Sequence, residues 1–344
     1  MNAAVFYGPN KIAVGPVPIA TGSAVLRVKA CAVCGYDVRV FRNGHGKVTP
    51  PVILGHELCG EVLKTVSSGV IKIKAGSRVA VCPVAPCLDC HYCHSGDYNL
   101  CRCLKELGST VNGGFAEFVG VPEQVLRIGG LVPVSDDLSD EEAALLEPLA
   151  CCLNSLSRMG APGKGGTAVI IGDGTMGLIH LQLLKLAGAR VAVVGKVRSR
   201  MQKARDLGAD MVTEYQDPET TAEEILDFTS SIGASMVIVA TSNPASIELA
   251  KRICAKSAVI NLFAGMPTDH RLVLDTNWAH YNQISVTGAF GSTPQKLKEA
   301  SQMTSEGKID LSKLVTHHYQ ISEIGQAFIA TERYLGLRAL INKF

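Results

Sequence analysis

Four cysteines stand close together in one short segment of the sequence, in the spacing C-x2-C-x2-C-x7-C: Cys87, Cys90, Cys93 and Cys101. Four thiolates at this spacing can close a tetrahedron around Zn²⁺ and leave no position open for a substrate. A closed site of this kind holds a loop in place and does no chemistry. The histidines between the ligands, His91 and His94, are interpreted as loop residues, because four thiolates already complete the coordination shell.

A second group of potential metal ligands is dispersed along the chain. Cys34 begins the segment Cys-Gly-Tyr-Asp, His56 and Glu57 are neighbours in Gly-His-Glu, and Glu147 opens Glu-Pro-Leu. A catalytic zinc takes a few protein ligands and keeps a position open for water or substrate. Cys34 and His56, with one or both of the glutamates, would supply such a shell. Each residue alone is explained by packing or surface exposure, but the set of four favours a catalytic metal.

A glycine-rich segment, Gly-Asp-Gly-Thr-Met-Gly, follows an apolar run and precedes a helical pattern. Glycines at such a point let the backbone approach a pyrophosphate, which the N-terminus of the next helix stabilises. The motif alone is weak evidence, but between a buried strand and a helix it predicts a dinucleotide site. The candidate cofactor-binding residues of this segment are Gly172, Gly174, Thr175, Met176 and Gly177.

The end of the next expected strand bears on the choice of cofactor. In NAD-binding proteins this strand ends in an acidic residue that binds the ribose hydroxyls. Here Gly195 stands at that position, and three cations follow it: Lys196, Arg198 and Arg200. A missing carboxylate removes repulsion from a 2′-phosphate, and the cations attract it. The sequence therefore favours NADP over NAD. The alternative interpretation is a basic surface loop.

The elements that must position these residues change in character along the chain. Short β-like runs separated by Gly and Pro predict an all-β, barrel-like unit near the N-terminus: Ala24–Ala30, Gly60–Val66, Arg78–Cys82 and Phe115–Val121. Beyond it, buried strands alternate with helices, which predicts an α/β fold with a doubly wound parallel sheet. Its expected strands are Thr167–Ile171, Arg190–Val194, Ala234–Ala240 and Ser257–Phe263, and its expected helices are Met176–Ala189, Ser199–Gly208 and Ser246–Ala255. A last amphipathic helix, Pro294–Glu306, precedes a polar tail with one β-like piece, Ala339–Ile341.

Length and composition narrow the class of protein. A chain of 344 residues is expected to form two or three domains. A net charge of +2 gives no general surface for nucleic acid, and no apolar run reaches the length of a membrane span. The N-terminal segment has no signal-peptide pattern. The 12 cysteines therefore predict a reduced, metal-binding protein of the cytoplasm rather than a disulfide framework.

Together these motifs resemble the zinc-containing medium-chain dehydrogenase/reductase family, in its sorbitol or polyol dehydrogenase branch. The resemblance covers essentially the whole chain and rests on CGYD at Cys34–Asp37, GHE at 55–57, the four-cysteine lobe, GGFAE at Gly113–Glu117, EPLA at Glu147–Ala150 and GDGTMG at Gly172–Gly177. Liver-type alcohol dehydrogenases carry cysteine where this chain has the glutamate of EPLA, and this difference indicates the polyol branch.

The resemblance implies an EC 1.1.1.- enzyme that transfers a hydride between a secondary alcohol, or its ketone, and NADP or NAD, with two Zn²⁺ per chain. It implies a GroES-like β-barrel catalytic domain (1–154 and 291–344, zinc lobe about 84–104) and a Rossmann domain (155–290). It also implies a homodimer or homotetramer, with Ile284–Phe290 as the strand that pairs.

Two positions depart from the family pattern, and both belong to the expected proton relay. Tyr36 stands where relatives usually carry Ser or Thr, so its bulkier phenol must be placed differently. Arg39 stands where many relatives carry His, and arginine does not deprotonate near neutrality. Either Tyr36 and water carry the proton, or His45 approaches from the following loop.

The substrate is left between two alternatives. A glutamate ligand is harder and more easily exchanged than a thiolate, which suits the oxygens of a vicinal diol such as a sugar alcohol. The alternative is a sugar-alcohol phosphate of the galactitol 1-phosphate type, whose phosphate Arg39, Arg42 and Lys47 would bind. Surface charge is the preferred interpretation of these three residues. A non-catalytic zinc-ribbon protein would explain the four-cysteine lobe and nothing else.

Overall fold

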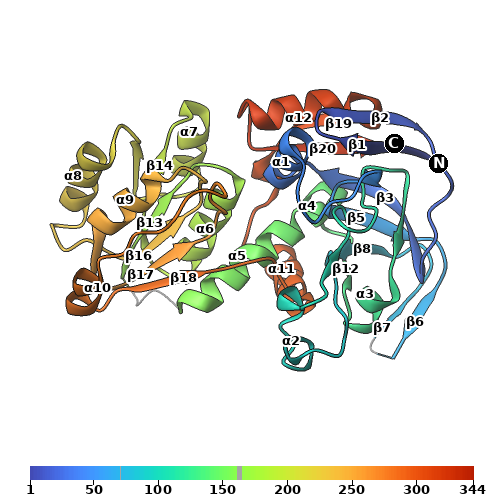
Figure 1. The fold of residues 1–344 in the computed structure, drawn as a ribbon, viewed down its shortest axis with the longest axis horizontal. Coiled ribbons are helices and arrows are strands. Elements are labelled where there is room, and N and C mark those ends of the chain that lie inside the picture. The colour runs from blue at the N-terminus through green and yellow to red at the C-terminus, as the bar shows by residue number, and fades with distance from the viewer. Residues whose placement is uncertain (70, 161–164) are drawn as a thin grey trace. The chain divides into compact units, whose positions relative to one another are not determined.

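The computed structural model describes residues 1–69, 71–160 and 165–344, which form two compact units (Figure 1). The first unit comprises Met1–Ala150 and Gly291–Phe344, and the second comprises Cys151–Phe290. The boundary between Ala150 and Cys151 falls within helix α5 (Leu146–Met159). No helix of the described residues has the length and apolar character needed to cross a membrane.

The first unit is built around a seven-stranded sheet in the order β12-β8-β5-β3-β20-β19, with β11 also paired to β3. Its elements from the N-terminal segment are β1 (Asn2–Gly8), β2 (Lys11–Pro16), β3 (Ala24–Ala32), α1 (Gly35–Asn43), β4 (Val52–Ile53), β5 (Glu57–Val62), β6 (Val66–Ser68), β7 (Ile71–Ile73), β8 (Arg78–Val81), β9 (Val84–Ala85), α2 (His91–His94), η1 (Tyr98–Leu100), β10 (Lys105–Glu106), β11 (Phe118–Val121), α3 (Glu123–Arg127), β12 (Leu131–Pro133) and α4 (Asp140–Ala144). Its elements from the C-terminal segment are α11 (Pro294–Ser305), η2 (Ser312–Leu314), β19 (Val315–Gln320), η3 (Ile321–Glu323), α12 (Ile324–Glu332) and β20 (Arg338–Lys343).

Strand β3 is the centre of this sheet. Its sequence AVLRVKACA alternates buried and more exposed positions before it becomes fully buried near its end. Such alternation suits a strand with one face on the core. The strand pairs antiparallel with β5, β11 and β20, so the last strand of the chain lies directly beside it. The core under the sheet includes the fully buried rings of Phe6, Phe115 and Phe328.

The second unit is a six-stranded, all-parallel sheet in the order β15-β14-β13-β16-β17-β18. Its elements after α5 are β13 (Thr167–Ile171), α6 (Thr175–Leu186), β14 (Arg190–Gly195), α7 (Arg198–Asp206), β15 (Met211–Glu214), α8 (Pro218–Phe228), β16 (Ala234–Val239), α9 (Ala245–Ile253), β17 (Cys254–Leu262), α10 (Thr276–Asn282) and β18 (Ser285–Gly288). The central strands are nearly continuous apolar runs, as expected where both faces of a parallel sheet are covered. The chain leaves β13 toward β14 on one side and returns as β16 on the other, which makes the end of β13 a topological switch point.

The expected α/β class and the doubly wound sheet are confirmed, and several expected boundaries are corrected. The expected strand Gly60–Val66 is wrong in extent, because β5 begins at Glu57 and ends at Val62. The expected start at Phe115 is also wrong: Phe115 N donates to Leu54 O, and Phe115 O accepts from Ala4 N, before β11 begins. The polar tail holds β19 and α12 in addition to the one strand that was expected.

Candidate functional site

Helix α1 begins directly after Cys34, and its first turn shows why. The Cys34 backbone N–H donates to Oδ2 of Asp37 at 2.9 Å. An acidic side chain at the third helical position caps the N-terminus in this way, and its charge is also favourable at the positive end of the helix dipole. The Cys34 thiol is thereby fixed at the point where the chain leaves strand β3 for the helix.

His56 lies just before strand β5 and faces the same carboxylate. Its Nδ1 is 3.5 Å from Oδ1 of Asp37, and its side chain is 16 % exposed. Burial alone lowers the pKa of His56, but the Asp37 carboxylate and the Cys34 sulfur raise it, and the net result is a pKa well above its ordinary value. Because Asp37 faces Nδ1, the Nε2 atom of the ring is left for another partner.

Glu57 is the first residue of β5 and is paired in register with Ala32 at the end of β3. Its side chain is buried, and Oε1 accepts a hydrogen bond from Nη2 of Arg338 at 2.7 Å. Burial raises the pKa of Glu57, and the charge of Arg338 acts in the opposite direction. The other oxygen, Oε2, is buried and has no hydrogen-bond partner among the described residues.

Cys34, His56 and Glu57 converge on one point. One ligand atom from each lies within 4.8 Å of the others. One buried carboxylate oxygen of this cluster, Oε2 of Glu57, lacks a hydrogen-bond partner among the described residues. Such oxygens are costly to bury unless a cation or water satisfies them. A thiolate, an imidazole and a carboxylate form a donor set that suits zinc, so the residues present fit this metal.

Glu147, the second glutamate expected as a ligand, lies outside this cluster. The group of mutually close ligand atoms in the described residues contains Glu57 and not Glu147. Glu147 is 7 % exposed on α5. Burial lowers the pKa of Arg338, while the charges of Glu57, Cys34 and Glu147 raise it, so Glu147 belongs to the electrostatic surroundings of the site.

Tyr36 adds a hydroxyl group to the same region. Its Oη is 2.9 Å from Oγ of Ser109, and the ring meets His56 edge-on at 5.7 Å between centroids. Burial raises the pKa of Tyr36. His45, the alternative relay residue, also contacts the Tyr36 ring edge-on, at 5.5 Å. Ser109, Asp37 and Arg338 were not predicted to act here.

The four-cysteine lobe brings its thiols together as a second cluster. Cys87, Cys90, Cys93 and Cys101 each offer a sulfur, and these sulfurs lie within 4.8 Å of one another. The Cys87 backbone N–H points at Sγ of Cys101 at 3.1 Å. Backbone amides of Arg102 and Cys93 lower the pKa of Cys90 to about 6. Amide donors directed at sulfur stabilise thiolates, which are the form that zinc binds.

The glycine-rich loop lies at the switch point of the parallel sheet, between β13 and α6. Gly172 has φ 127°, and a Cβ there would lie 2.9 Å from Ala240 O. A Cβ on Gly177 would lie 2.0 Å from Gly172 O. Gly174 is the N-cap of α6, so the first turn of the helix, with Thr175 and Met176, starts from the loop. This tight turn with a free helix N-terminus is a cradle that fits a pyrophosphate.

The predicted cofactor-selecting residues follow β14, whose end lies beside the glycine-rich loop through the pairing of Ile171 with Val194. Gly195 is buried, whereas Lys196 and Arg198 are exposed. The Lys196 ammonium group lies over the Tyr215 ring, 4.8 Å from its centroid. Arg200 is 8 % exposed, and its Nη1 is 3.9 Å from the place where a Cβ on Gly174 would stand.

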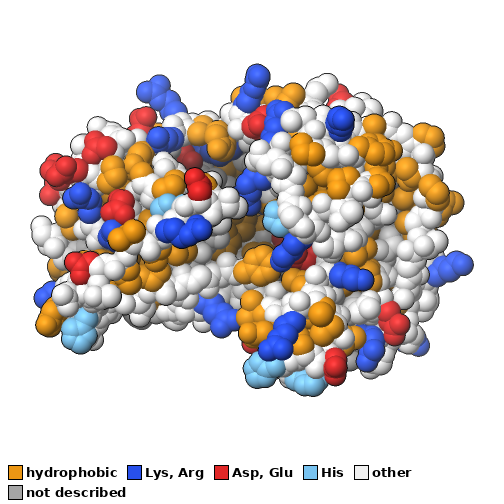
Figure 2. All heavy atoms as spheres, in the orientation of Figure 1, with side chains coloured by type: hydrophobic (Ala, Val, Ile, Leu, Met, Phe, Trp, Pro, Cys, Tyr) orange, Lys and Arg blue, Asp and Glu red, His pale blue; other side chains and the backbone are white. Residues whose placement is uncertain are grey.

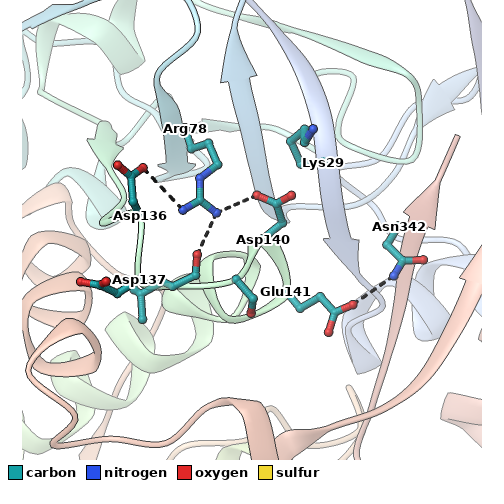
Figure 3. A pocket seen from close by; sticks show the side chains of 9 residues that line it. Lys29, Arg78, Asp136, Asp137, Asp140, Glu141 and Asn342 are labelled. Carbon is teal, nitrogen blue, oxygen red and sulfur yellow. Dashed lines mark hydrogen bonds and ion pairs between the residues drawn. The ribbon is translucent and has the colours of Figure 1, made fainter.

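A surface pocket of about 650 Å³ on the first unit contains none of the predicted site residues (Figure 3). The side chains that line it are mostly charged, and Arg78 forms hydrogen bonds within this lining. The Arg78 guanidinium donates to Oδ1 of Asp140 at 3.0 Å and to two backbone carbonyls. Glu141 accepts from Asn342 at 3.0 Å (Figure 3). These side chains satisfy one another, so the pocket is explained as a structural network.

A dinucleotide cradle at the switch point of a parallel sheet, in a chain that also carries an open thiol–imidazole–carboxylate cluster, defines a metal-assisted pyridine-nucleotide oxidoreductase. Two family models match: the alcohol dehydrogenase GroES-like domain over residues 20–130, and zinc-binding dehydrogenase over residues 175–306. The chain belongs to the zinc-containing medium-chain dehydrogenase/reductase family, in its polyol branch. It is a zinc-dependent oxidoreductase that acts on an alcohol with NAD or NADP.

Similar proteins cover nearly the whole chain. D-arabitol-phosphate dehydrogenase of Enterococcus avium is 31 % identical over 319 residues, 91 % of this chain and 88 % of that protein. Sorbitol dehydrogenase of Halalkalibacterium halodurans is 31 % identical over 323 residues, 92 % of this chain and 90 % of that protein. A solved zinc-binding dehydrogenase of Sinorhizobium meliloti, bound to NADP, has a TM-score of 0.89 and 25 % identity, and the match covers 99 % and 98 % of the two chains.

Proposed function

We propose that this enzyme oxidises a secondary hydroxyl group of a polyol or sugar alcohol to the ketone, and reduces the ketone in the reverse direction. The observation that carries the proposal is the convergence of Cys34, His56 and Glu57 within 4.8 Å. These residues would hold the catalytic zinc, which supplies Lewis-acid polarisation of the substrate oxygen when bound. A bound nicotinamide would accept the hydride from the alcohol carbon, and the hydroxyl proton would leave to solvent.

The chain's own residues have separate tasks in this scheme. Asp37 faces His56 Nδ1 and caps the helix that carries Cys34, so one carboxylate orients two ligands. Arg338 takes one oxygen of Glu57 and leaves the other for a cation. Tyr36, whose ring contacts His56, offers a hydroxyl group for passing the substrate proton, and Ser109 fixes its direction. Glu147 contributes negative charge to the surroundings of the site and is the second candidate glutamate ligand of the zinc.

A free polyol is favoured over a phosphorylated one. Of the three cations that a phosphate would use, Arg42 is already bound: its Nε and Nη2 donate to the two carboxylate oxygens of Glu332 at 2.7 and 2.5 Å. Arg39 is exposed on α1. A bidentate pair of this kind uses two donors of the guanidinium and neutralises its charge, which weakens its attraction for a second anion.

The test is a panel of free and phosphorylated sugar alcohols, assayed with both nicotinamide cofactors and with zinc present. Activity on free polyols is expected to exceed that on the phosphates. Cys34→Ser should abolish turnover and lower the zinc content from two to one per chain. Cys59→Ser is the matched control, because Cys59 is a buried cysteine of the same strand as Glu57 and, within the described part of the chain, its Sγ donates to Asp140. Two zincs in Cys34→Ser would refute the ligand assignment.

We further place the enzyme in the cytoplasm as a homodimer or homotetramer without nucleic-acid or membrane partners. The 12 cysteines, all of them among the described residues, form no disulfide, which suits a reducing compartment. Cationic and anionic side chains are interspersed on the face shown in Figure 2. Strand β18 is an edge strand of the parallel sheet, where a second copy can add its own edge. Light scattering coupled to gel filtration tests the assembly, and a monomer would contradict it.

A further inference from the structure

The side chain of Asp173, inside the glycine-rich loop, reaches across to the end of the neighbouring strand. Its Oδ2 accepts hydrogen bonds from the backbone N–H of Lys196, at 2.9 Å, and of Val197, at 2.8 Å. These are the two residues that follow β14 directly. A carboxylate from one strand's loop thus caps the turn that leaves the adjacent strand.

Gly195 shows what space this carboxylate occupies. A Cβ on Gly195 would lie 2.6 Å from Oδ2 and 2.8 Å from Cβ of Asp173. Real Cβ atoms do not approach other atoms so closely, so the acidic group fills the volume that a side chain at residue 195 would need. Position 195 is also the place where NAD-binding folds carry the acid that recognises the ribose. The chain therefore has no acidic residue at position 195, but the carboxylate of Asp173 occupies the space beside that position.

The Asp173 carboxylate can still accept a hydrogen bond from a ligand. The two backbone bonds both go to Oδ2, and Asp173 as a whole is 8 % exposed. Oδ1 is not among the buried atoms without a partner in the described residues, which is consistent with access to solvent. An ionised carboxylate can accept at both oxygens. Of the cations of the expected phosphate site, Lys196 has its ammonium group over the Tyr215 ring, and Arg200 Nη1 lies 3.9 Å from the place of a Cβ on Gly174.

From this geometry we propose that Asp173 is the ribose-recognising residue and that the enzyme prefers NAD(H) to NADP(H). Oδ1 accepts from a ribose hydroxyl of NAD, and the same charge repels a 2′-phosphate. This assignment opposes the preference expected from Gly195 and its following cations. It rests on the proposed function only in needing a nicotinamide dinucleotide, and it requires neither zinc nor alcohol.

The experiment measures dissociation constants of NADH and NADPH without substrate, by energy transfer from Trp278, the one tryptophan of the chain, to the reduced nicotinamide. Wild type should bind NADH at least about tenfold more tightly, the size expected for one charge-assisted hydrogen bond. Asp173→Asn keeps an acceptor for the backbone and removes the charge, so the NADPH/NADH ratio of dissociation constants should fall about tenfold. When 5′-AMP and adenosine 2′,5′-bisphosphate are used as competitors, the ratio of their inhibition constants should shift in the same direction in Asp173→Asn.

Asp210→Asn is the matched control. Asp210 caps the other end of β14 through the Val191 N–H, at 2.6 Å, and pairs with Lys185. Its loss should leave the ratio unchanged. Gly195→Ala is a second variant that should displace the Asp173 carboxylate and lower the ratio in the same direction. Tighter binding of NADPH by wild type, or an unaltered ratio in Asp173→Asn, would overturn the assignment. Because no turnover is measured, failure here is distinct from failure of the polyol dehydrogenase proposal.

Discussion

Arg338, six residues before Phe344, donates from Nη2 to Oε1 of Glu57 at 2.7 Å, and the two side chains are 6 % and 2 % exposed. Its Nη1 also points at Val33 O at 3.3 Å. The pairing of β20 with β3, Leu340 with Ala32, sets this contact. Strand β20 is therefore part of the scaffold that holds the cluster of Cys34, His56 and Glu57.

We expect Arg338→Ala to destabilise the first unit strongly, because it leaves the Glu57 charge buried without its partner. Breaking a buried ion pair from one side costs about 3–5 kcal/mol. The double variant Arg338→Met with Glu57→Gln should recover part of this loss, since no buried charge remains. Denaturant unfolding followed by far-UV circular dichroism measures the change. Trp278 lies in the second unit, so its fluorescence transition serves as an internal reference. Equal stability of Arg338→Ala and wild type would contradict the assignment.

Asp37→Asn should weaken zinc binding at the cluster of Cys34, His56 and Glu57 without removing a metal ligand. The change lowers the charge beside His56 Nδ1, and such an orienting partner is worth about 10–100-fold in metal affinity. Competition with a chromogenic chelator should release one zinc per chain more easily, while the second is retained. Asp136→Asn is the control, because Asp136 is a fully exposed acid of the same unit. Unchanged zinc release from Asp37→Asn would show that the carboxylate only caps the helix.

Cys93→Ser should remove the other zinc. Cys93 is buried in the lobe, with its Sγ 3.6 Å from that of Cys90, and three thiolates hold zinc less well than four. Metal analysis should give one zinc per chain, and limited proteolysis should cut within the lobe. Cys103→Ser is the control, because Cys103 is an exposed cysteine two residues beyond Cys101 that belongs to no cluster in the described residues. Retention of two zincs by Cys93→Ser would exclude the closed four-sulfur site.

The features that the sequence predicted well are those whose signal is local. Four cysteines within one segment, a glycine-rich turn between an apolar run and a helix, and the strand Thr167–Ile171 all depend on neighbours in the chain. The parallel sheet follows because alternating strands and helices have few ways to fold.

The features that the sequence did not reveal depend on partners far apart along the chain. Arg338 is 281 residues from Glu57, and nothing in the segment Arg-Ala-Leu-Ile-Asn-Lys marks it as part of a metal site. Ser109 is 73 residues from Tyr36. Asp37 could have been found, since an acid three residues after Cys34 is a capping signal. Gly195 was interpreted as a missing acid because the sequence does not show that Asp173 reaches the same volume.

The stability of the second unit should fall as the pH is lowered from 7 to 5, because His180 is buried in a neutral form. Its Nδ1–H donates to Met176 O at 2.8 Å, its ring packs edge-on against Phe263, and burial lowers its pKa to about 4. In the unfolded chain the pKa is about 6.5, so between these values the unfolded state binds the extra proton and is favoured. The loss should reach about 2 kcal/mol at pH 5. Denaturant unfolding followed by Trp278 fluorescence measures it.

The variant His180→Gln separates this residue from the other groups that titrate in the same range. Glutamine keeps a donor for Met176 O but does not ionise, so the unfolding free energy of the variant should be lower at pH 7 and nearly flat down to pH 5. His280→Gln is the control, because His280 is an exposed histidine of the same unit and should retain the wild-type slope. If wild type and His180→Gln lose stability in parallel as the pH falls, the proton taken up on unfolding belongs to another group, and His180 is not buried in the neutral form that its contacts indicate.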